Sequence, residues 1–355
     1  IANLCEPVDT PAAAASYLRP ILDPPDGSGD GRYLLGGGPL SFSAIERLSR
    51  GPDGLLREMA TSADAAALAR LTRPRPALPG LGGPPPFIAG ILNVTPDSFS
   101  DGGRTLAPDK AVARGMALLA DGADLLDIGG ESTRPGAGEV PLEVEIARVV
   151  PVIRALAAEG ATISIDTRKA AVMTAALDAG ATIVNDVSAL AFDPRALDVV
   201  AEAGVPVILM HSRGTPETMA RLKRYDDILL GVIDELRIRI EACLAAGIAE
   251  ARIIIDPGVG FAKGPAQNPT LLKHLVLLHG LGYPVMIGTS RKSFIGHIAG
   301  VDDPLDRLPG SLASGLWAVS QGVQYLRVHD VAETRQAVAV WRAIAAAPGG
   351  GSQTN

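Results

Sequence analysis

The sequence predicts an α/β protein whose main part is a (β/α)8 TIM barrel, preceded by an N-terminal extension of about 86 residues. From Phe87 to about Ala347, short apolar runs alternate with amphipathic stretches, and strands that alternate with helices form a parallel sheet. Eight such units fit into about 260 residues, which is a typical barrel length. A doubly wound open sheet is the alternative. Its glycine-rich nucleotide fingerprint is missing, because the first strand continues into Asn93-Val94-Thr95-Pro96-Asp97.

The expected strands are short apolar runs, and each is followed by a longer amphipathic stretch. The strands are expected at 87–93, 125–129, 162–166, 182–186, 206–211, 252–256, 284–288 and 325–329. The helices are expected near 108–120, 142–158, 169–179, 194–203, 226–246, 267–279, 308–321 and 331–346. Together they define a barrel domain over 87–347, followed by a flexible tail at 348–355.

Residues 1–86 have a different composition and are expected to form an extension that packs on the barrel. Turn and linker compositions rich in Pro and Gly occur at 24–31, 36–39 and 79–86. Between them, Ser43 and Glu46 have the spacing of a capping box, which predicts a short helix to about Ser49. The alanine-rich segment 55–71 also favours helix. This part contains no chemical motif, and its function stays open.

Composition excludes several classes of function. The formal net charge is −7, so no broad basic field is available for duplex nucleic acid. No stretch approaches the ~18 uninterrupted apolar residues that a membrane span needs. Cys5 and Cys243 are too few for a disulfide framework, and the first residues lack the basic and apolar regions of a signal peptide. We therefore expect a soluble, cytoplasmic protein whose partners are neither nucleic acid nor membrane.

Polar and mostly ionisable residues follow nearly every predicted strand. The active site of a (β/α)8 barrel forms at the C-terminal ends of its strands. Because buried charge is costly without a partner, a barrel kept only for structure does not need such a ring. The strand ends carry Asn93, Glu131 to Gly136, Asp166, Asn185 with Asp186, Met210 with His211, Asp256, Ser290 to Ser293, and Arg327 to Asp330.

The ring suits a flat heterocycle with a guanidine-like edge. Asp166, Asn185 and Asp256 offer carboxylate and amide groups from three neighbouring strands, and these groups accept hydrogen bonds from N–H donors. Lys292 adds a donor for a ring carbonyl or nitrogen. Apolar walls can come from Val187, Met210 and Phe261.

A second part of the ring suits an anion. Arg327 and His329 end the last strand, where barrels often hold phosphate, and the planar guanidinium of Arg327 can also lie on a ring face. Asn93 and the loop 97–103 can complete a Mg²⁺ site, because Mg²⁺ prefers few protein oxygens plus substrate phosphate. The sequence shows no His/Cys cluster with zinc spacing and no nucleophilic triad.

The motifs at these strand ends resemble those of the dihydropteroate synthase family over about 87–347. Residues 90–103 (GILNVTPDSFSDGG) resemble its first signature, and residues 129–137 (GGESTRPGA) resemble its second. Further motifs follow in the family's order and spacing: 164–167 (SIDT), 185–187 (NDV), 209–211 (LMH), 256–261 (DPGVGF), 290–294 (SRKSF) and 327–330 (RVHD).

The resemblance implies a transferase of folate biosynthesis. Such an enzyme joins 4-aminobenzoate to 6-hydroxymethyl-7,8-dihydropterin diphosphate and releases diphosphate and dihydropteroate. It also implies Mg²⁺ as cofactor, a homodimer formed through the last helices, and inhibition by sulfonamides, which copy 4-aminobenzoate. Two alternatives share the Asp, Asn and Asp ring: a methyltetrahydrofolate-type pterin methyltransferase, and a non-catalytic pterin-binding paralogue. The first should lack the two loop signatures and the second should have lost loop residues, but both signatures are intact here.

The same resemblance assigns roles to individual residues. The pterin-binding residues are Asp166, Asn185, Val187, Met210, Asp256, Phe261, Lys292 and Arg327. The diphosphate-binding residues are Asn93, Thr133, Arg327 and His329, and Asn93 is also the metal ligand. The 4-aminobenzoate pocket comprises Phe99, Thr133, Arg134, Pro135, Lys292 and Ser293. The expected catalytic residues are Asp166, Lys292, Arg327 and His329.

Overall fold

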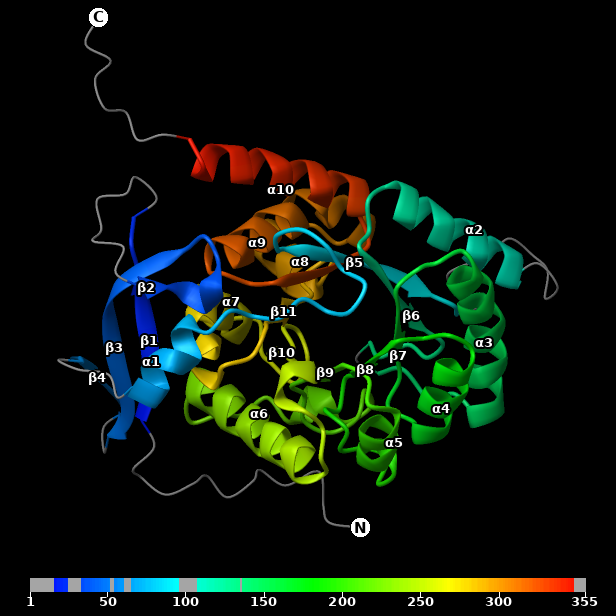
Figure 1. Ribbon diagram of the computed structural model, residues 1–355, viewed down its shortest axis with the longest axis horizontal. Helices are drawn as coiled ribbons and strands as arrows, with labels where there is room; N and C mark the ends of the chain where they lie inside the picture. The colour runs from blue at the N-terminus through cyan, green and yellow to red at the C-terminus, as the bar shows by residue number, and fades with distance from the viewer. Residues whose placement is uncertain are drawn as a thin grey trace, which may run out of the picture.

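The computed structural model describes residues 16–24, 33–51, 54–60, 65–95, 107–134 and 136–347. Its centre is an eight-stranded parallel sheet in the hydrogen-bonded order β10-β9-β8-β7-β6-β5-β12-β11 (Figure 1). A parallel bridge between Ile255 of β10 and Val285, just before β11, joins the two ends of this order. The sheet therefore closes on itself, and the predicted (β/α)8 barrel is confirmed. The strands are β5 (Phe87–Asn93), β6 (Leu125–Gly129), β7 (Ile163–Asp166), β8 (Ile183–Asp186), β9 (Val207–Met210), β10 (Ile253–Asp256), β11 (Met286–Ile287) and β12 (Tyr325–Val328).

Helices cover the outside of the barrel and agree with the predicted ranges to within a few residues. They are α2 (Ala107–Ala120), α3 (Leu142–Ala158), α4 (Ala170–Asp178), α5 (Ala196–Ala203), α6 (Ile228–Ala245), α7 (Gln267–Lys273), α9 (Leu308–Ser320) and α10 (Val331–Ala345). The range 267–279 divides into α7 and a 3₁₀ helix, η5 (Leu275–Leu281), and the short helix α8 (Ser293–Ala299) was not predicted. Shorter 3₁₀ turns are η1 (Leu35–Gly37), η3 (Met219–Arg221), η4 (Glu250–Arg252) and η6 (Pro304–Arg307). Within the described ranges, no helix is both long enough and apolar enough to cross a membrane.

The barrel interior changes from apolar to polar along the strands. Its N-terminal half is filled by one apolar cluster: Phe87, Ala89, Leu125, Ile183, Ile208, Ile254, Met286 and Tyr325. Leu78, from the segment before β5, joins this cluster, and its backbone N–H donates to the Tyr325 hydroxyl at 3.0 Å. Side chains alternate along a strand, so the next inward positions lie at the C-terminal end of the barrel. Those positions carry the polar residues of the site.

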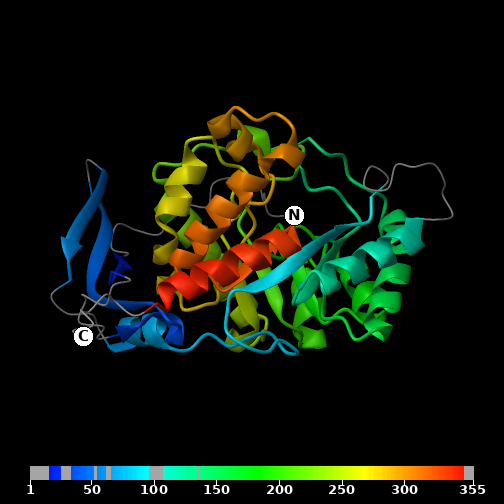
Figure 2. The same cartoon turned by 90° about the horizontal axis from the view of Figure 1, so that it is seen from above.

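The extension forms a second, antiparallel sheet beside the barrel (Figures 1 and 2). Its strands are β1 (Ser16–Leu22), β2 (Tyr33–Leu34), β3 (Ser41–Gly51) and β4 (Gly54–Met59), followed by α1 (Ala65–Thr72). The long strand β3 pairs with the other three. A small core contains Leu35, Phe42, Ile45 and Leu71 together with Val276 of η5. A buried hydrogen bond of 2.8 Å from the Tyr17 hydroxyl to Asp234 of α6 also joins this sheet to the barrel.

The helix predicted from Ser43 to Ser49 is wrong, because these residues lie within β3. Phe42, Ile45 and Leu48 are the buried residues of this strand, and their spacing of three is easily mistaken for a helical pattern. Pairing with β1 on one side and β4 on the other overrides the local preference. The capping-box side chains are used elsewhere: Ser43 donates to Asp23 at 2.6 Å, and Glu46 accepts from Arg19 at 2.9 Å.

The helix favoured over 55–71 is only partly present. Its first residues form β4, which pairs with β3, and α1 begins at Ala65. The predicted tail at 348–355 lies outside the described residues.

Candidate active site

Four inward-facing side chains from β6, β7, β8 and β12 form one hydrogen-bonded group at the C-terminal end of the barrel. The Arg327 Nε donates to Asp127 Oδ2 at 2.5 Å, and Arg327 Nη2 donates to Asp166 Oδ2 at 2.6 Å. The Asn185 amide donates to the same Asp127 oxygen at 3.1 Å. Strand pairing brings these residues together. Asp127 is in register with Ser164, two residues before Asp166, and Asp166 is in register with Asn185. The predicted residues Asp166, Asn185 and Arg327 thus belong to one hydrogen-bonded group, together with Asp127, which was not predicted.

Two acceptor oxygens of this group are not used by any residue that the structure describes. Asp166 Oδ1 and Asp127 Oδ1 are both buried and have no hydrogen-bond partner among the described residues. Burial raises the pKa of Asp166 to about 7, against the opposing effect of Arg327, and the nearby Asp127 and Asp186 carboxylates raise it further. A ligand with adjacent N–H donors would supply the partners that such buried acceptors need.

Asp256 and Lys292 form the other side of the ring. The Lys292 ammonium donates to the Val259 carbonyl and lies 4.7 Å from the centroid of the Phe261 ring. Burial lowers the pKa of Lys292 to about 8, although Asp256 opposes this shift. Burial also raises the pKa of Asp256, against the effect of Lys292. The two groups therefore interact electrostatically inside the barrel.

The loop after β10 can approach this pocket only with glycine at position 258. Gly258 has a φ of +64°, and a Cβ there would lie 1.9 Å from the His211 carbonyl oxygen. Its N–H donates to Asp256 Oδ1 at 2.7 Å, which fixes the carboxylate. Lys263 supports the same loop, because its ammonium donates to the Phe261 carbonyl at 2.9 Å and lies 3.0 Å from His211 Nδ1.

His329 is held as a neutral imidazole at the end of β12. Its Nδ1 lies 3.0 Å from the Ser290 hydroxyl. Burial lowers the pKa of His329 to about 3, and the cations Arg327 and Arg291 add to this shift. Arg291 itself has a left-handed φ of 58° and donates through Nε to Asp330 at 3.0 Å. The backbone turn at Arg291 therefore directs Ser290 and Lys292 to the site.

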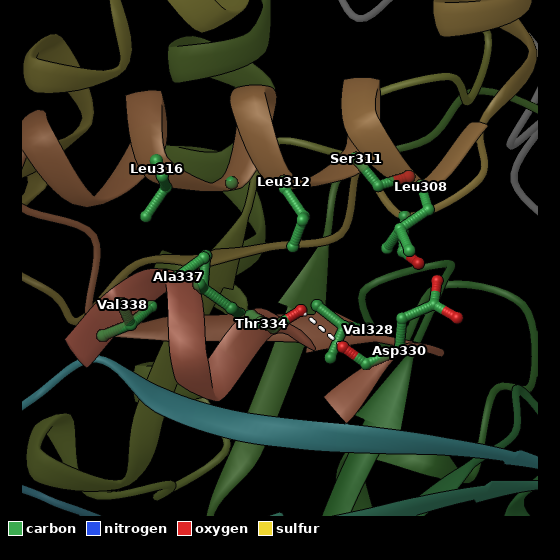
Figure 3. Close-up of a pocket in the computed structure, with 12 residues that line it drawn as sticks. Leu308, Ser311, Leu312, Leu316, Val328, Asp330, Thr334, Ala337 and Val338 are labelled. Carbon is green, nitrogen blue, oxygen red and sulfur yellow. Dashed lines mark hydrogen bonds between the residues drawn. The ribbon is translucent and has the colours of Figure 1, made fainter. Parts of the chain in front are cut away.

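A small cavity lies behind this turn and is separate from the ring. Figure 3 shows it between α9 and α10, with Ser311 and Asp330 at its polar end and leucine and valine side chains elsewhere. Leu326 and Val328 line it from the helix-facing side of β12, whereas Arg327 points into the barrel. The cavity is therefore part of the packing beneath the helices.

The other predicted site residues that the structure describes lie around the mouth of the barrel. Val187 and Met210 are buried after β8 and at the end of β9, where they can serve as apolar walls. Asn93 is half-buried at the end of β5, next to Gly129 of β6. Thr133 is half-buried and Arg134 is exposed in the loop after β6, and Ser293 begins α8. Phe99 and Pro135 lie outside the described residues.

The fit of Mg²⁺ rests on Asn93 and on the substrate. In the described part of the chain, no group of three or more His, Cys, Asp or Glu side chains is arranged to hold a metal ion. Asn93 offers one amide oxygen at the mouth of the barrel. Mg²⁺ is commonly bound by one or two protein groups plus substrate phosphates and water, so this donor fits an ion that is shared with a diphosphate.

Sequence reasoning missed Asp127 and Lys263. Asp127 lies two residues before the end of β6, so it is not among the strand-end residues from which the site was predicted. Its signal was present, because it is an ionisable residue at an inward position of the otherwise apolar run 125–129. Lys263 lies beyond the strand-end motif, and nothing in the local pattern indicates that its ammonium turns back to Phe261.

Comparison with known proteins places this site in a family. Residues 89–329 match the family model described as "Pterin binding enzyme". The chain belongs to this family of pterin-binding barrels. Its relatives include dihydropteroate synthases of several bacteria. That of Escherichia coli K12 is 45% identical over 256 residues, which cover 72% of this chain and 90% of the relative. That of Synechocystis is 44% identical over 261 residues, which cover 72% and 90%.

Solved structures agree with this assignment. The dihydropteroate synthase of Xanthomonas albilineans with 4-aminobenzoic acid is 51% identical, with a TM-score of 0.71, and the match covers 74% of this chain and 94% of that one. The Yersinia pestis enzyme, solved in complex with a sulfonamide drug, is 45% identical, with a TM-score of 0.72 and coverage of 76% and 99%. The chain therefore belongs with the dihydropteroate synthases, as its motifs predicted.

Proposed function

We infer that the protein acts as a dihydropteroate synthase. It transfers the pterinylmethyl group of 6-hydroxymethyl-7,8-dihydropterin diphosphate to the amino group of 4-aminobenzoate. One observation carries this inference: Asp166 and Asp127 present buried acceptor oxygens, without a partner in the described part of the chain, beside a fixed guanidinium. The reaction is inferred from the family, and the site has the buried hydrogen-bond acceptors that the N–H groups of a pterin require.

The pterin fits the interior of the ring. Its aminopyrimidine N–H groups donate to the Asp166, Asn185 and Asp256 side chains, while Lys292 donates to a ring acceptor. Arg327 is held by two carboxylates, so its guanidinium plane is fixed and can stack on the flat ring. Val187, Met210 and Phe261 then form the apolar walls.

The diphosphate is placed at the mouth of the barrel, near Asn93, Thr133, Arg327 and His329. The neutral His329 imidazole donates a hydrogen bond there, and the Arg327 cation adds charge. Asn93 would hold Mg²⁺ together with the diphosphate, and the ion would neutralise charge that develops on the leaving group. The support for these roles is the position of the residues at the strand ends and the fit described above.

The transfer exchanges one bond for another. The bond between the pterin methylene carbon and the diphosphate oxygen breaks, and a carbon–nitrogen bond to 4-aminobenzoate forms as the amine loses a proton. The dihydropterin ring is electron-rich, so positive charge spreads over it in the transition state, and Asp166 and Asp256 stabilise that charge. The aniline nitrogen is already a nucleophile, so positioning matters more than a general base.

The 4-aminobenzoate pocket is placed beside the diphosphate site. Thr133 and Arg134 supply it from the loop after β6, and Lys292 and Ser293 supply it from the start of α8. Phe99 and Pro135 complete the proposed set. This arrangement lets the amine reach the methylene carbon, while the carboxylate of the ligand stays at the rim.

We propose that the protein works as a homodimer. Trp317 of α9 is 46% exposed, and Val340 and Ile344 of α10 are 56% and 70% exposed. Large apolar side chains on two adjacent helices are typical of an interface. A second copy of the chain suits them, because the family resemblance implies pairing through this side.

The experiment for this function is a product assay with the full chain. Purified protein is mixed with the pterin diphosphate and 4-aminobenzoate, with and without Mg²⁺, and dihydropteroate and diphosphate are measured by mass spectrometry. We expect both products in equal amounts, with formation dependent on Mg²⁺. Methyl transfer from methyltetrahydrofolate would favour the methyltransferase alternative, and pterin binding without product would favour a non-catalytic paralogue.

A further inference from the structure

Four buried charged side chains lie beneath the loop that follows β6. Glu131, at the start of this loop, is 6% exposed, and Glu145 of α3 is 0% exposed. Arg168 and Lys169, from the turn after β7, are 4% and 6% exposed. Two carboxylates therefore face two cations, and the group has no net formal charge. A neutral set of this kind can be buried only if its hydrogen bonds are well formed.

Glu131 uses both of its carboxylate oxygens. Oε2 accepts from Arg168 Nε at 3.0 Å. Oε1 accepts from Lys169 Nζ at 3.0 Å and from the Val140 backbone N–H at 2.7 Å. Although burial opposes the change, these hydrogen bonds hold the pKa of Glu131 below its usual value.

Lys169 connects the same atoms from the other side. Its ammonium donates to the Val140 carbonyl at 2.5 Å and to Glu145 Oε2 at 2.7 Å. Glu145 also accepts from the Thr167 hydroxyl at 2.6 Å, so its position is fixed. Glu131 thus binds the backbone N–H of Val140 and Lys169 binds its carbonyl. Val140 lies nine residues after Glu131 in the same loop.

The start of the loop is packed just as closely. Gly130 lies so near α3 that a Cβ there would approach Val149 Cγ1 to 2.8 Å and Glu145 Cγ to 3.0 Å. The Gly130 carbonyl accepts from Arg148 at 2.8 Å. Farther along, the Gly136 N–H donates to the Pro216 carbonyl at 2.9 Å. The segment that presents Thr133 and Arg134 is therefore held at its start, at its end and at one point between them.

We propose that Glu131 and Lys169 are positioning residues for 4-aminobenzoate. They tie position 131 to position 140, so Thr133 and Arg134 are presented at the mouth of the barrel in one arrangement. The proposal rests on the function inferred above. The hydrogen bonds of these two side chains go to Val140, Glu145, Arg168 and each other, and none goes to Asp166, Asn185 or Arg327. We therefore expect their removal to leave the contacts of the pterin ring in place. A misplaced positioning segment lowers the rate although it makes no contact with the reacting atoms.

The test uses the double variant Glu131→Met/Lys169→Met in the full chain. It removes one negative and one positive charge, so the formal charge of the group stays zero with Glu145 and Arg168 remaining. We expect the KM for 4-aminobenzoate to rise about tenfold or more. The Kd for 6-hydroxymethyl-7,8-dihydropterin, which lacks the diphosphate that Thr133 would contact, should be unchanged within about twofold. Glu131→Gln keeps an acceptor for the Val140 N–H, so it should give an intermediate rise.

Asp234→Asn is the matched control. Asp234 is 4% exposed and belongs to another buried ionic group, with Tyr17 and Arg50, far along the chain. This variant should lower the melting temperature and leave both constants unchanged. Thermal unfolding of every variant shows whether the chain is folded at the assay temperature.

The results separate two failures. Wild-type protein that makes no dihydropteroate overturns the proposed function. If the wild type is active, an unchanged KM for 4-aminobenzoate in the folded double variant overturns the positioning role. So does an equal loss of affinity for 4-aminobenzoate and for the dihydropterin without diphosphate, because a general structural effect would produce it.

Discussion

The Arg327 guanidinium donates a hydrogen bond of 2.6 Å to Asp166 and contacts only one of the two carboxylate oxygens, Oδ2. The other, Oδ1, is buried and has no partner among the described residues. Asp166 thus gives one acceptor oxygen to Arg327 and keeps the other available. Asp127 accepts a hydrogen bond from Arg327 Nε at 2.5 Å. The plane of the guanidinium is therefore fixed by two carboxylates of the protein itself.

Asp127 should be required for pterin affinity although the motifs did not single it out. Asp127→Ala leaves Arg327 Nε and the Asn185 amide without their shared acceptor. The variant also removes the buried acceptor Asp127 Oδ1. Losing one buried hydrogen bond costs about 1–3 kcal/mol, so we expect affinity for the pterin diphosphate to fall about 10- to 100-fold. Titration calorimetry measures this loss. Asp127→Asn keeps an acceptor and should lose less, and equal affinity in the alanine variant and the wild type would refute the role.

Pterin affinity should have a maximum between about pH 7 and pH 8. Asp166 accepts as a carboxylate and its pKa is raised to about 7, so affinity should rise as pH increases through that value. Lys292 donates best as an ammonium and its pKa is lowered to about 8, so affinity should fall as pH increases further. Binding isotherms from pH 5.5 to 9.5 test both limbs. Asp166→Asn should remove the rising limb alone, and a flat profile for the wild type would contradict this account.

Sulfonamides should compete with 4-aminobenzoate. They share its aniline ring, so rejection can come only from the rim of the pocket. We expect sulfamethoxazole to raise the apparent KM for 4-aminobenzoate without changing kcat, and to be converted slowly into a pterin adduct. Steady-state kinetics with mass spectrometry measures both effects. An inhibition constant hundreds of times the KM for 4-aminobenzoate would oppose this prediction, since that ratio needs about 3 kcal/mol of selective rejection.

The exposed apolar residues of α9 and α10 should hold two copies together. Sedimentation at micromolar concentration should give twice the chain mass of 36.5 kDa. Trp317→Asp combined with Ile344→Asp should reduce it to a single chain, because charge at the centre of an apolar interface is costly. Met116→Asp on α2, which is 39% exposed, is the control and should leave the dimer intact. A wild-type monomer would exclude the proposed assembly.

The barrel could be predicted because its strands and helices are short, regular and separated by clear turns. Asp166 and Asp256 end their strands as expected, and Asn185 lies one residue before the end of β8, since the C-terminal ends of parallel strands meet on one face. Asp127 could not be found by inspecting strand ends, because it lies one inward position deeper. Its role depends on Arg327, which is 200 residues away in the chain.

The extension shows where sequence patterns fail. Ser43 and Glu46 have the spacing of a helix cap, yet they lie in β3, where Asp23 and Arg19 take their side chains. The decisive partners, β1 and β4, could not be recognised from β3 alone. The loop after β6 is similar. Its motif can be recognised in the sequence, but the contact of Glu131 with Arg168 and Lys169 depends on β6 and β7 lying side by side in the fold.

The central claim is that a pterin binds to the acceptors around Asp166. Its most direct test is calorimetric titration of the pterin diphosphate into the wild type and into Asp166→Ala, with Asp124→Ala, just before β6 at the opposite end of the barrel, as the control. We predict that affinity falls at least tenfold in Asp166→Ala, because the ligand loses its buried acceptor, and that it is unchanged in the control. Equal affinity in the wild type and in a folded Asp166→Ala protein would contradict the claim.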